Sequence, residues 1–405
     1  MIALRPFRSW RPVAEKAHLV GSRTYVSYSP GELAQRLADN PHSFLHVLRP
    51  DDADSAHLSR SERFHRVRMA FKRFCDNGTM QRDDAPAILL YEQSAHGNTS
   101  RGIIAGVSVQ DYREGRIKVH EQTLTARENL FAEYLGSTGI NAEPVLLTTP
   151  EGAAWEATLD PLLATQPAYD FRSNDRVRHR LWPITDERMR EQLQRAFAKI
   201  PALYIADGHH RLASSARLAE ANNATDVDPA SWCLAFIVPR SHLFIYNFDR
   251  AITTIGDRNE KDFLQELTRI GRLEKVDAPW SAPGVIAVRT GEGWHVLHLP
   301  PAAANVSAAD RLDAARLSEL VLGPVLGIKD LRTDQRVRFI PGIAGTTELD
   351  RMVDTGEAAV AFHLYPVNFT ELKAVADAGG TMPPKSTYIE PKLRSGLVVY
   401  SLEDV

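Results

Sequence analysis

Apolar positions along the chain recur with two spacings, and each spacing predicts a different kind of element. In residues 58–77 they return every three or four positions, which is typical of one face of a helix. Residues 87–93 and 102–109 are short apolar runs separated by a turn at 96–98, so they predict two strands joined as a hairpin.

The same two patterns extend over the rest of the chain. Helices are predicted over residues 31–40, 125–135, 185–199 with Thr185 as N-cap, 212–221, 261–270, 308–321 and 368–378, and strands over 116–120, 144–147, 202–206, 232–239, 242–247, 359–364 and 396–402, with a hairpin at 286–299. The polar stretch 150–180 is expected to carry one strand at most. This mixture favours an α/β (mixed α+β) fold with mixed sheets over a doubly wound parallel sheet.

Length and composition narrow the class of protein. The 405 residues suggest two or three domains, and we expect regions at 1–150, 151–250 and 251–405. Hydrophobic residues make up 43% and charged residues 24%, with a net charge of −3, so no basic surplus indicates nucleic-acid binding. No apolar run approaches the ~18 residues of a membrane span, and the start of the chain lacks a signal-peptide pattern.

The two cysteines, Cys75 and Cys233, lie far apart in apolar surroundings. They form neither a disulfide framework nor a zinc motif, and they suit a reducing compartment. We therefore expect a cytoplasmic protein without membrane or nucleic-acid partners, and a homodimer is left open.

Asp-Gly-His-His-Arg at 207–211 is the strongest chemical signal in the chain. It follows the apolar run 202–206 and directly precedes a predicted helix, whose N-terminus presents free N–H groups and a positive dipole end. Gly208 permits close approach of the backbone to a ligand. His209, His210 and Arg211 add cationic donors, so the junction is expected to hold phosphate.

Asp207 has two candidate roles at this junction. It is positioned to hold Mg²⁺ beside the phosphates or to act as a base, together with the two histidines. The structural alternative makes Asp207 an N-cap and the histidines buried hydrogen-bonding groups. A dedicated metal site is disfavoured, because adjacent histidines do not easily share one ion and no HExxH or CxxC partner is present.

A second polar cluster follows the strand predicted at 116–120. Glu121 stands beside His120 and close to Thr123, which makes it a candidate general base for a substrate hydroxyl, with His120 and Thr123 as substrate contacts. The alternative is a solvated strand end. Glu121 gains weight only if the fold brings it near Asp207.

A third segment lies near the end of the chain. Lys385, Ser386 and Thr387 follow two prolines, and Lys392 comes shortly after them. Lysine and hydroxyl side chains of this kind contact phosphates, so we expect 385–387 to bind the cofactor and Lys392 the substrate, with the loop packed back on the site. The alternative is a rigid surface loop, and the Walker A frame is absent.

Several of these segments resemble one known family. They are IADGHHRLASSA at 205–216, GIIAGVSVQDYREGRIKVHEQT at 102–123, MPPKSTYIEPKLRSGLV at 382–398, LRPFRSWRP at 4–12 and NPHSFLHVLRP at 40–50. The family is a large group of bacterial and archaeal proteins that is catalogued as a domain of unknown function. The resemblance covers nearly the whole chain, with its motifs in the same order.

The DGHHR element is also similar to the phosphate-binding motif of the ParB/sulfiredoxin-like fold, which includes free serine kinases. That resemblance implies a ParB/sulfiredoxin-like core with further mixed-sheet regions, the core lying in 151–250, and it implies ATP or ADP with Mg²⁺ as cofactors. It also implies that residues 207–211 hold nucleotide phosphate and that an upstream glutamate is the base. Glu121 takes this place by its order in the chain.

Two departures from the family pattern indicate a divergent substrate. Thr24-Tyr25-Val26-Ser27 stands where the family has Pro-Tyr-Asp, and Asn247-Phe248-Asp249-Arg250 stands where it has Thr-His-Arg. The leading hypothesis is a kinase that phosphorylates the hydroxyl of L-serine or a related hydroxy amino acid. The alternatives are a nucleotide-binding regulator of the ParB kind and a phosphatase or lyase acting on a phosphorylated metabolite.

Overall fold

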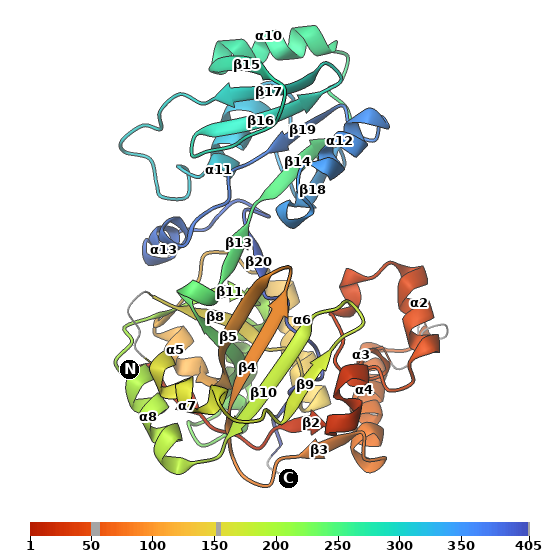
Figure 1. The fold of residues 1–405 in the computed structure, drawn as a ribbon, viewed down its shortest axis with the longest axis vertical. Coiled ribbons are helices and arrows are strands. Elements are labelled where there is room, and N and C mark those ends of the chain that lie inside the picture. The colour runs from red at the N-terminus through yellow and green to blue at the C-terminus, as the bar shows by residue number, and fades with distance from the viewer. Residues whose placement is uncertain (50–56, 151–154, 404–405) are drawn as a thin grey trace. The chain divides into compact units, whose positions relative to one another are not determined.

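The computed structural model describes residues 1–49, 57–150 and 155–403, and it divides the chain into two compact units (Figure 1). Unit 1 comprises Met1–Lys118, Thr123–Leu243 and Pro391–Val405, and unit 2 comprises Val119–Gln122 and Phe244–Glu390. Each unit is therefore assembled from stretches that are not consecutive in the sequence. The three-region division at residues 150 and 250 stays a prediction.

A mixed sheet forms the centre of unit 1. Its strand order is β6-β11-β8-β12-β5-β4-β10-β9, with β1 also pairing β5. The strands are β1 (Leu4–Arg5), β4 (Ile88–Ala95), β5 (Asn98–Ser108), β6 (Ile117–Lys118), β8 (Val145–Thr149), β9 (Tyr169–Arg172), β10 (Arg178–Ile184), β11 (Leu203–Asp207) and β12 (Trp232–Pro239). The β11–β6 and β12–β8 pairs are parallel and the other pairs are antiparallel. The β4–β5 hairpin and the strand at 232–239 are confirmed.

The helices of unit 1 begin at recognisable sequence signals. They are α1 (Ala17–Val20), α2 (Pro30–Asp39), α3 (Leu45–Leu48), α4 (Arg60–Asp76), α5 (Val109–Arg113), α6 (Thr125–Thr138), α7 (Asp160–Leu163), α8 (Glu187–Phe197) and α9 (His209–Ala221). Ser29 and Ser59 open α2 and α4 through capping boxes with Glu32 and Glu62. Two small ladders, β2 (Trp10–Pro12) with β3 (Met80–Arg82) and β7 (Ile140–Asn141) with β21 (Tyr400–Ser401), complete the unit.

Unit 2 is built on an antiparallel sheet of order β15-β17-β16-β19-β14-β18. Its elements are β14 (Phe248–Ile252), β15 (Arg272–Val276), β16 (Val285–Thr290), β17 (Gly293–His298), β18 (Val337–Pro341), β19 (Val360–His363), a separate ladder of β13 (Phe244–Tyr246) with β20 (Tyr388–Glu390), and the helices α10 (Glu260–Ile270), α11 (Asp313–Leu317), α12 (Thr347–Asp354) and α13 (Phe369–Asp377). The predicted hairpin at 286–299 is confirmed as β16–β17.

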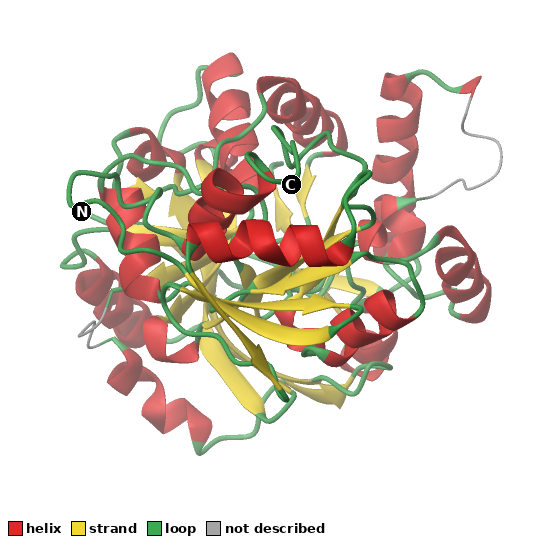
Figure 2. Cartoon of the chain, turned by 90° about the horizontal axis from the view of Figure 1, so that it is seen from above, coloured by secondary structure: helices red, strands yellow, loops and turns green. Residues whose placement is uncertain are grey.

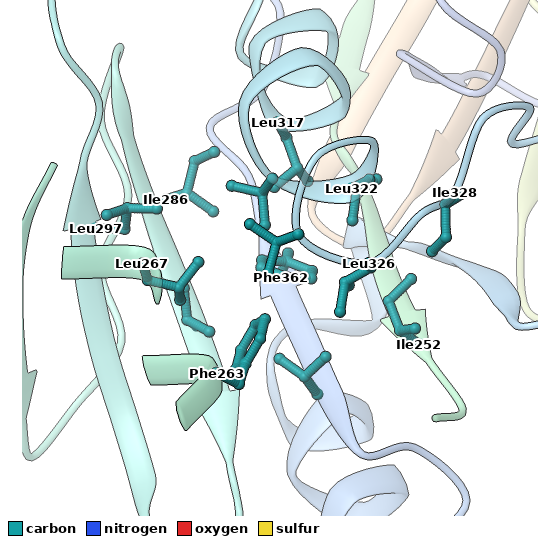
Figure 3. Packing of buried hydrophobic residues seen from close by; sticks show 14 of the residues in the cluster. Ile252, Phe263, Leu267, Ile286, Leu297, Leu317, Leu322, Leu326, Ile328 and Phe362 are labelled. Atoms are coloured by element: carbon teal, nitrogen blue, oxygen red, sulfur yellow. The ribbon is translucent and has the colours of Figure 1, made fainter. Parts of the chain in front are cut away.

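One face of this sheet carries the main hydrophobic core of unit 2. Phe362 of β19 is fully buried and points toward side chains of two helical segments (Figure 3). Phe263 comes from α10, and Leu317 comes from the end of α11. Because α11 is anchored through this core, the polar residues that precede Leu317 are held at fixed positions.

Several boundaries differ from the sequence predictions. The stretch 150–180, of which 151–154 lie outside the described residues, carries β9 and the start of β10 rather than one strand at most. That prediction was wrong because the outward positions of β9 are charged and mask the strand pattern: Asp170 pairs with Arg178 on β10. The N-cap of α8 is Asp186, which accepts from the Met189 amide at 2.8 Å, and not Thr185.

Further differences concern element ends. The helix predicted at 308–321 is the short α11 followed by a π-helical turn at Ser318–Leu322, and the strand predicted at 396–402 is reduced to β21. The helix predicted from Leu212 begins three residues earlier, so 209–211 form its first turn.

Helices and strands are abundant and intermixed (Figure 2), which confirms the α/β (mixed α+β) class. A ParB/sulfiredoxin-like core stays a prediction. None of the helices within the described ranges has both the length and the apolar character needed to cross a bilayer.

Candidate functional site

The DGHHR segment forms the junction between β11 and α9. The β11–β8 ladder shifts its register between Ile205 and Asp207, so Asp207 leaves the regular pairing just before the turn. Gly208 then adopts φ 97°, a left-handed conformation that is costly for other residues. A Cβ at this position would lie 3.1 Å from Nη1 of Arg211 and 3.4 Å from Cα of Val145. The backbone conformation therefore favours glycine, and a larger residue would also force the Arg211 side chain to shift.

The N-terminus of α9 has no side-chain cap at its N-cap residue. Gly208 is the N-cap, so the N-cap offers no side chain to the amides of the first turn. The Gly208 carbonyl accepts from Arg211 at 2.9 Å and from Leu212 at 3.2 Å, which fixes the start of the helix. An anion at this end is favoured by the helix dipole and by the amide groups.

Asp207 is held as a carboxylate beside this helix end. Its side chain is 44% exposed, and Oδ2 lies 3.3 Å from Nζ of Lys392. Withdrawal from solvent acts to raise the pKa of Asp207, but Lys392, Arg211 and His209 outweigh it and lower the pKa to about 2. Asp207 is therefore ionised at neutral pH, and since Gly208 is the N-cap, capping does not explain its position.

The guanidinium of Arg211 is held by two residues that directly precede β8. Its Nη1 donates to the carbonyl of Pro144 at 2.8 Å, and its Nη2 lies 3.1 Å from Oε2 of Glu143. Glu143 in turn accepts from Oγ of Ser395 at 2.5 Å. Sequence reasoning missed Glu143, which no motif marks, and gave no role to Ser395, although it lies in the 382–398 motif; only the fold brings the two together beside Arg211.

The two histidines lie in the first turn of α9. His209 is buried and His210 is half-buried. The hydroxyls of Ser214 and Ser215 donate to the carbonyls of His210 and Arg211 at 2.6 and 3.0 Å, which stabilises this turn. The turn therefore presents its residues in one defined geometry.

Thr123 lies where α6 packs on α9. Its hydroxyl donates to Glu128, and Nε of Arg217 donates to the same carboxylate. Burial acts to raise the pKa of Glu128, but Thr123 and Arg217 lower it. The structure thus commits the Thr123 hydroxyl to an internal contact, and its contact with substrate stays a prediction.

The segment that carries Lys392 is fixed within unit 1. Two residues further on, Nη2 of Arg394 donates to Oδ2 of Asp175 at 2.7 Å. Lys392 is half-buried and is brought to Asp207 across 185 positions of sequence. Of the predicted site residues, 207–211 and Lys392 therefore share one site.

The remaining predicted residues belong to unit 2. The carbonyl of His120 accepts from the amide of Met382 at 2.8 Å, so the His120-Glu121 segment adjoins the loop that carries residues 385–387. His120 is buried, Glu121 is exposed, and Thr387 is half-buried. Two distant motifs of the sequence are thereby joined within one unit.

The loop at 382–387 has a fixed backbone. Lys385 adopts φ 54°, and its Nζ lies 5.2 Å from the centre of the Phe248 ring. Nη2 of Arg250 donates to the Lys385 carbonyl at 3.0 Å, and Oγ of Ser386 donates to the Pro383 carbonyl at 2.8 Å. Because Asp207 and Glu121 belong to different units, their proximity stays a prediction.

Metal ligands are sparse in the structure. In the described ranges, no group of three or more His, Cys, Asp or Glu side chains is arranged to hold an ion. Asp207 offers one ionised carboxylate, which fits a cation that takes most of its ligands from phosphate and water.

Comparison with known proteins gives the family. Residues 4–315 match the family described as "Protein of unknown function (DUF1015)". The chain belongs to this family. No curated protein matches the chain.

Solved structures give more distant matches. A free serine kinase in complex with AMP is 14% identical, covers 73% of this chain and 92% of its own, and has a TM-score of 0.37. SbnI with C-terminal truncation from Staphylococcus aureus is 14% identical, with 73% and 87% covered and a TM-score of 0.38. A conserved hypothetical protein from Pyrococcus furiosus is 13% identical, with 74% and 96% covered and a TM-score of 0.37.

Proposed function

We propose that this DUF1015 protein is a kinase that transfers a phosphoryl group from ATP or ADP to the hydroxyl of a small polar molecule. The proposed acceptor is free L-serine or a related hydroxy amino acid. One observation carries the proposal: the glycine turn between β11 and α9 places an ionised Asp207, with Lys392 and Arg211 beside it, at a helix N-terminus without a side-chain cap.

Phosphoryl transfer mainly requires that the substrates are positioned and that the phosphate charge is neutralised. Each residue of this junction is assigned one of these roles. In this proposal the backbone amides of Gly208 and of the first turn of α9 donate hydrogen bonds to the phosphate oxygens. Arg211 adds a planar guanidinium that Pro144 and Glu143 already orient. Asp207 would hold Mg²⁺, which when bound neutralises charge on the phosphates. His209 and His210 supply donors or transfer protons next to the same anion.

The remaining roles are assigned to residues outside the β11–α9 junction. Glu121 is exposed and is assigned as the base that accepts the proton of the acceptor hydroxyl. Lys385, Ser386 and Thr387 are assigned to the nucleotide phosphates. His120, Thr123 and Lys392 are assigned to the acceptor.

The experiment is a product assay with defined donors and acceptors. Purified protein is incubated with Mg²⁺ and either ATP or ADP, together with L-serine, L-threonine or L-homoserine, and phosphorylated products are identified by ³¹P NMR and mass spectrometry. We expect a phosphorylated amino acid whose formation depends on the nucleotide. Absence of product across the panel, from protein with an intact melting transition, contradicts the kinase proposal.

The same assay separates the alternatives. Nucleotide binding without turnover, measured by calorimetry, favours a regulator. Release of phosphate from a phosphorylated metabolite without nucleotide favours a phosphatase or lyase.

A further inference from the structure

Unit 2 contains a cavity that shares one residue, Ser386, with the proposed kinase site and is otherwise lined by residues without an assigned role. Its volume is about 390 Å³, within the ~300–1,000 Å³ range of small-molecule pockets. It is bordered by the 283–285 segment, the end of β17 with the residues after it, α11 with the residues before it, the residues from β19 into α13, and by Asn247 and Ser386. All of these belong to one unit, so the cavity does not depend on how the two units are arranged.

The walls of this cavity carry charges of both signs. Asp313 and Glu371 contribute carboxylates, and Arg311 and Arg316 contribute guanidinium groups. Leu299, Leu364 and Val367 supply apolar surface between them. A pocket that attracts a simple anion needs a surplus of cationic groups, whereas this lining offers partners for a positive and a negative group of one ligand.

The buried pair of charges is rigidly placed. Both oxygens of Asp313 lie 3.0 Å from the amide nitrogen of Gly284, and Arg316 donates to the carbonyl of Pro300. Nη1 of Arg316 lies 3.9 Å from Oδ1 of Asp313, which is beyond hydrogen-bonding distance. The two groups therefore do not saturate each other, although their side chains are only 10% and 12% exposed.

Glu371 adds a second carboxylate from α13. It occupies the N3 position of a capping box and accepts from the Asn368 amide at 2.9 Å, which fixes its orientation. Burial raises the pKa of Asp313, and the charge of Glu371 acts in the same direction. A positive group placed beside the two carboxylates relieves both effects.

We propose that this cavity binds a small zwitterion of the amino-acid class, with its ammonium group held by Asp313 and Glu371 and its carboxylate held by Arg311 and Arg316. Arg316 lies at the buried end of this carboxylate site, and Arg311, whose Nη2 also donates to the Ala304 carbonyl at 2.6 Å, lies on the exposed side. This inference does not rest on the proposed kinase activity, because none of these four charged residues has a role in the proposed phosphoryl transfer; of the residues assigned to that transfer, only Ser386 lines the cavity.

Direct binding tests the proposal on the full-length protein. Isothermal titration is carried out with L-alanine, L-serine and L-glutamate, and with propionate and n-propylamine as probes that carry only one of the two charges. We expect at least one amino acid to bind, and both single-charge probes to bind at least tenfold more weakly, because each lacks one set of charged hydrogen bonds.

Three variants locate the binding. Asp313→Asn and Glu371→Gln keep the shapes and the backbone contacts of the side chains but remove one charge each, and each is expected to weaken binding about tenfold or more. Glu371→Gln keeps the test decisive if Asp313→Asn fails to fold, since glutamine also serves in a capping box. The matched control is Glu348→Gln on α12, whose carboxylate pairs with Arg351 outside the cavity.

Three results overturn the proposal. The first is no amino-acid binding up to about 10 mM. The second is binding that both cavity variants leave unchanged, and the third is equally tight binding of propionate, which would make the cavity a simple anion site.

Discussion

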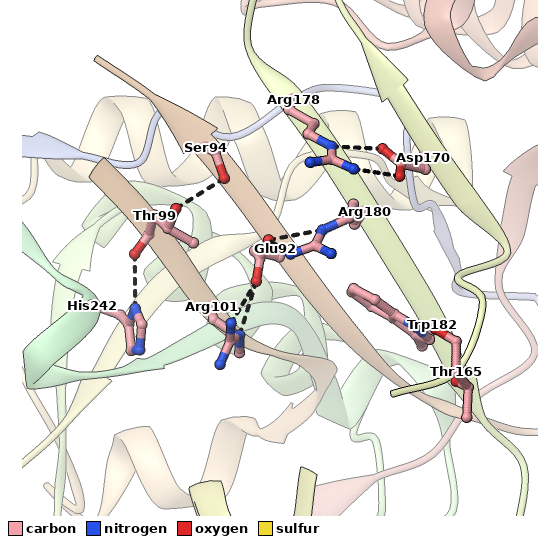
Figure 4. Close-up of polar contacts among 10 residues, drawn as sticks. All are labelled: Glu92, Ser94, Thr99, Arg101, Thr165, Asp170, Arg178, Arg180, Trp182 and His242. Carbon is pink, nitrogen blue, oxygen red and sulfur yellow. Dashed lines mark hydrogen bonds and ion pairs between the residues drawn. The ribbon is translucent and has the colours of Figure 1, made fainter. Parts of the chain in front are cut away.

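Two carboxylates of unit 1, Glu92 and Asp207, have cations on two sides but are used differently by the fold. Glu92 on β4 is 2% exposed, and each of its oxygens is bound by a different guanidinium (Figure 4). Arg101 donates through Nε and Nη2 at 2.9 and 2.8 Å, and Nε of Arg180 donates at 2.9 Å. Asp207 is 44% exposed, with Lys392 at 3.3 Å, while Arg211 donates to Pro144 and pairs with Glu143.

The difference lies in how much hydrogen-bonding capacity is left. A carboxylate has about four acceptor positions. Arg101 and Arg180 occupy those of Glu92 through paired donors, so this group holds neighbouring strands together. Asp207 has one long contact with Lys392 and keeps positions available for a ligand. Equal charge in the sequence therefore conceals one carboxylate that is saturated by structural contacts and one that fits the proposed role in ligand binding.

The largest effect is expected at Asp207. Asp207→Asn should lower kcat/KM of the proposed kinase by about 10²–10⁴-fold, because it removes the carboxylate charge that would hold Mg²⁺ beside the phosphates. The melting temperature should change little, because a solvent-exposed ion pair contributes less than about 1 kcal/mol. The control is Asp170→Asn, whose carboxylate is 40% exposed and pairs with Arg178 at 2.7 Å. Equal loss of activity in both variants would remove the distinction.

Glu92 should show the opposite pattern. Glu92→Ala leaves Arg101 and Arg180 without their shared buried anion, and we expect a loss of about 3 kcal/mol in the free energy of unfolding. Urea denaturation monitored by fluorescence measures it. A loss below about 1 kcal/mol would show that the network contributes no more than a surface pair.

His179 on β10 is buried like Glu92, and its burial should make the stability of the fold depend on pH. Its ring is 1% exposed and its Nδ1 lies 2.6 Å from the Tyr91 hydroxyl; burial and the charge of Arg394 lower its pKa to about 3. The unfolded chain binds this proton near pH 6.5. The folded state should therefore lose stability as the pH falls from about 6.5 to 3, by up to ~1.4 kcal/mol per pH unit.

Denaturation midpoints across this pH range check the prediction. The slope of the unfolding free energy against pH should decrease in His179→Gln by the contribution of one bound proton. The control His42→Gln should leave that slope unchanged. An unchanged slope in the His179 variant would show that other groups dominate the acid response.

The smallest effect concerns Gly208. Gly208→Ala imposes a left-handed backbone on alanine, which costs about 1–2 kcal/mol, and it crowds Nη1 of Arg211 at 3.1 Å. Gly115→Ala is the matched control, because φ is 71° there and nothing lies within 4 Å of the added carbon. We expect similar stability losses but a loss of nucleotide affinity only at Gly208, measured by calorimetry. Equal affinities would exclude a role for the Arg211 contact.

Local structure was readable from the sequence, and the pairing of distant segments was not. The apolar run at 202–206, the glycine and the following helix predicted the β11–α9 junction, since each rests on neighbouring residues. Glu143 lies in no motif and Ser395 had no predicted role, and their position beside Arg211 depends on the β11–β8 ladder and on the return of the chain at 391–403. In 150–180 the charged outward face of β9 masked the strand.

The division into units was equally hidden. Residues 119–122 leave unit 1 for unit 2 and the chain then returns at Thr123, although their composition matches that of their neighbours. The contact of His120 with Met382 depends on that excursion. Such long-range choices are made by tertiary packing and do not follow from propensity.

Lys392 follows Asp207 by 185 positions, so the two residues leave the ribosome at different times. The ribosome makes Asp207 and then 185 further positions before the lysine that pairs with it, roughly ten to forty seconds at 5–20 residues per second. During that interval the nascent chain holds an aspartate without its cation. The contact between Asp207 and Lys392 therefore forms only after most of unit 1 has been synthesised, so the proposed site is assembled late relative to the β11–α9 junction that carries it.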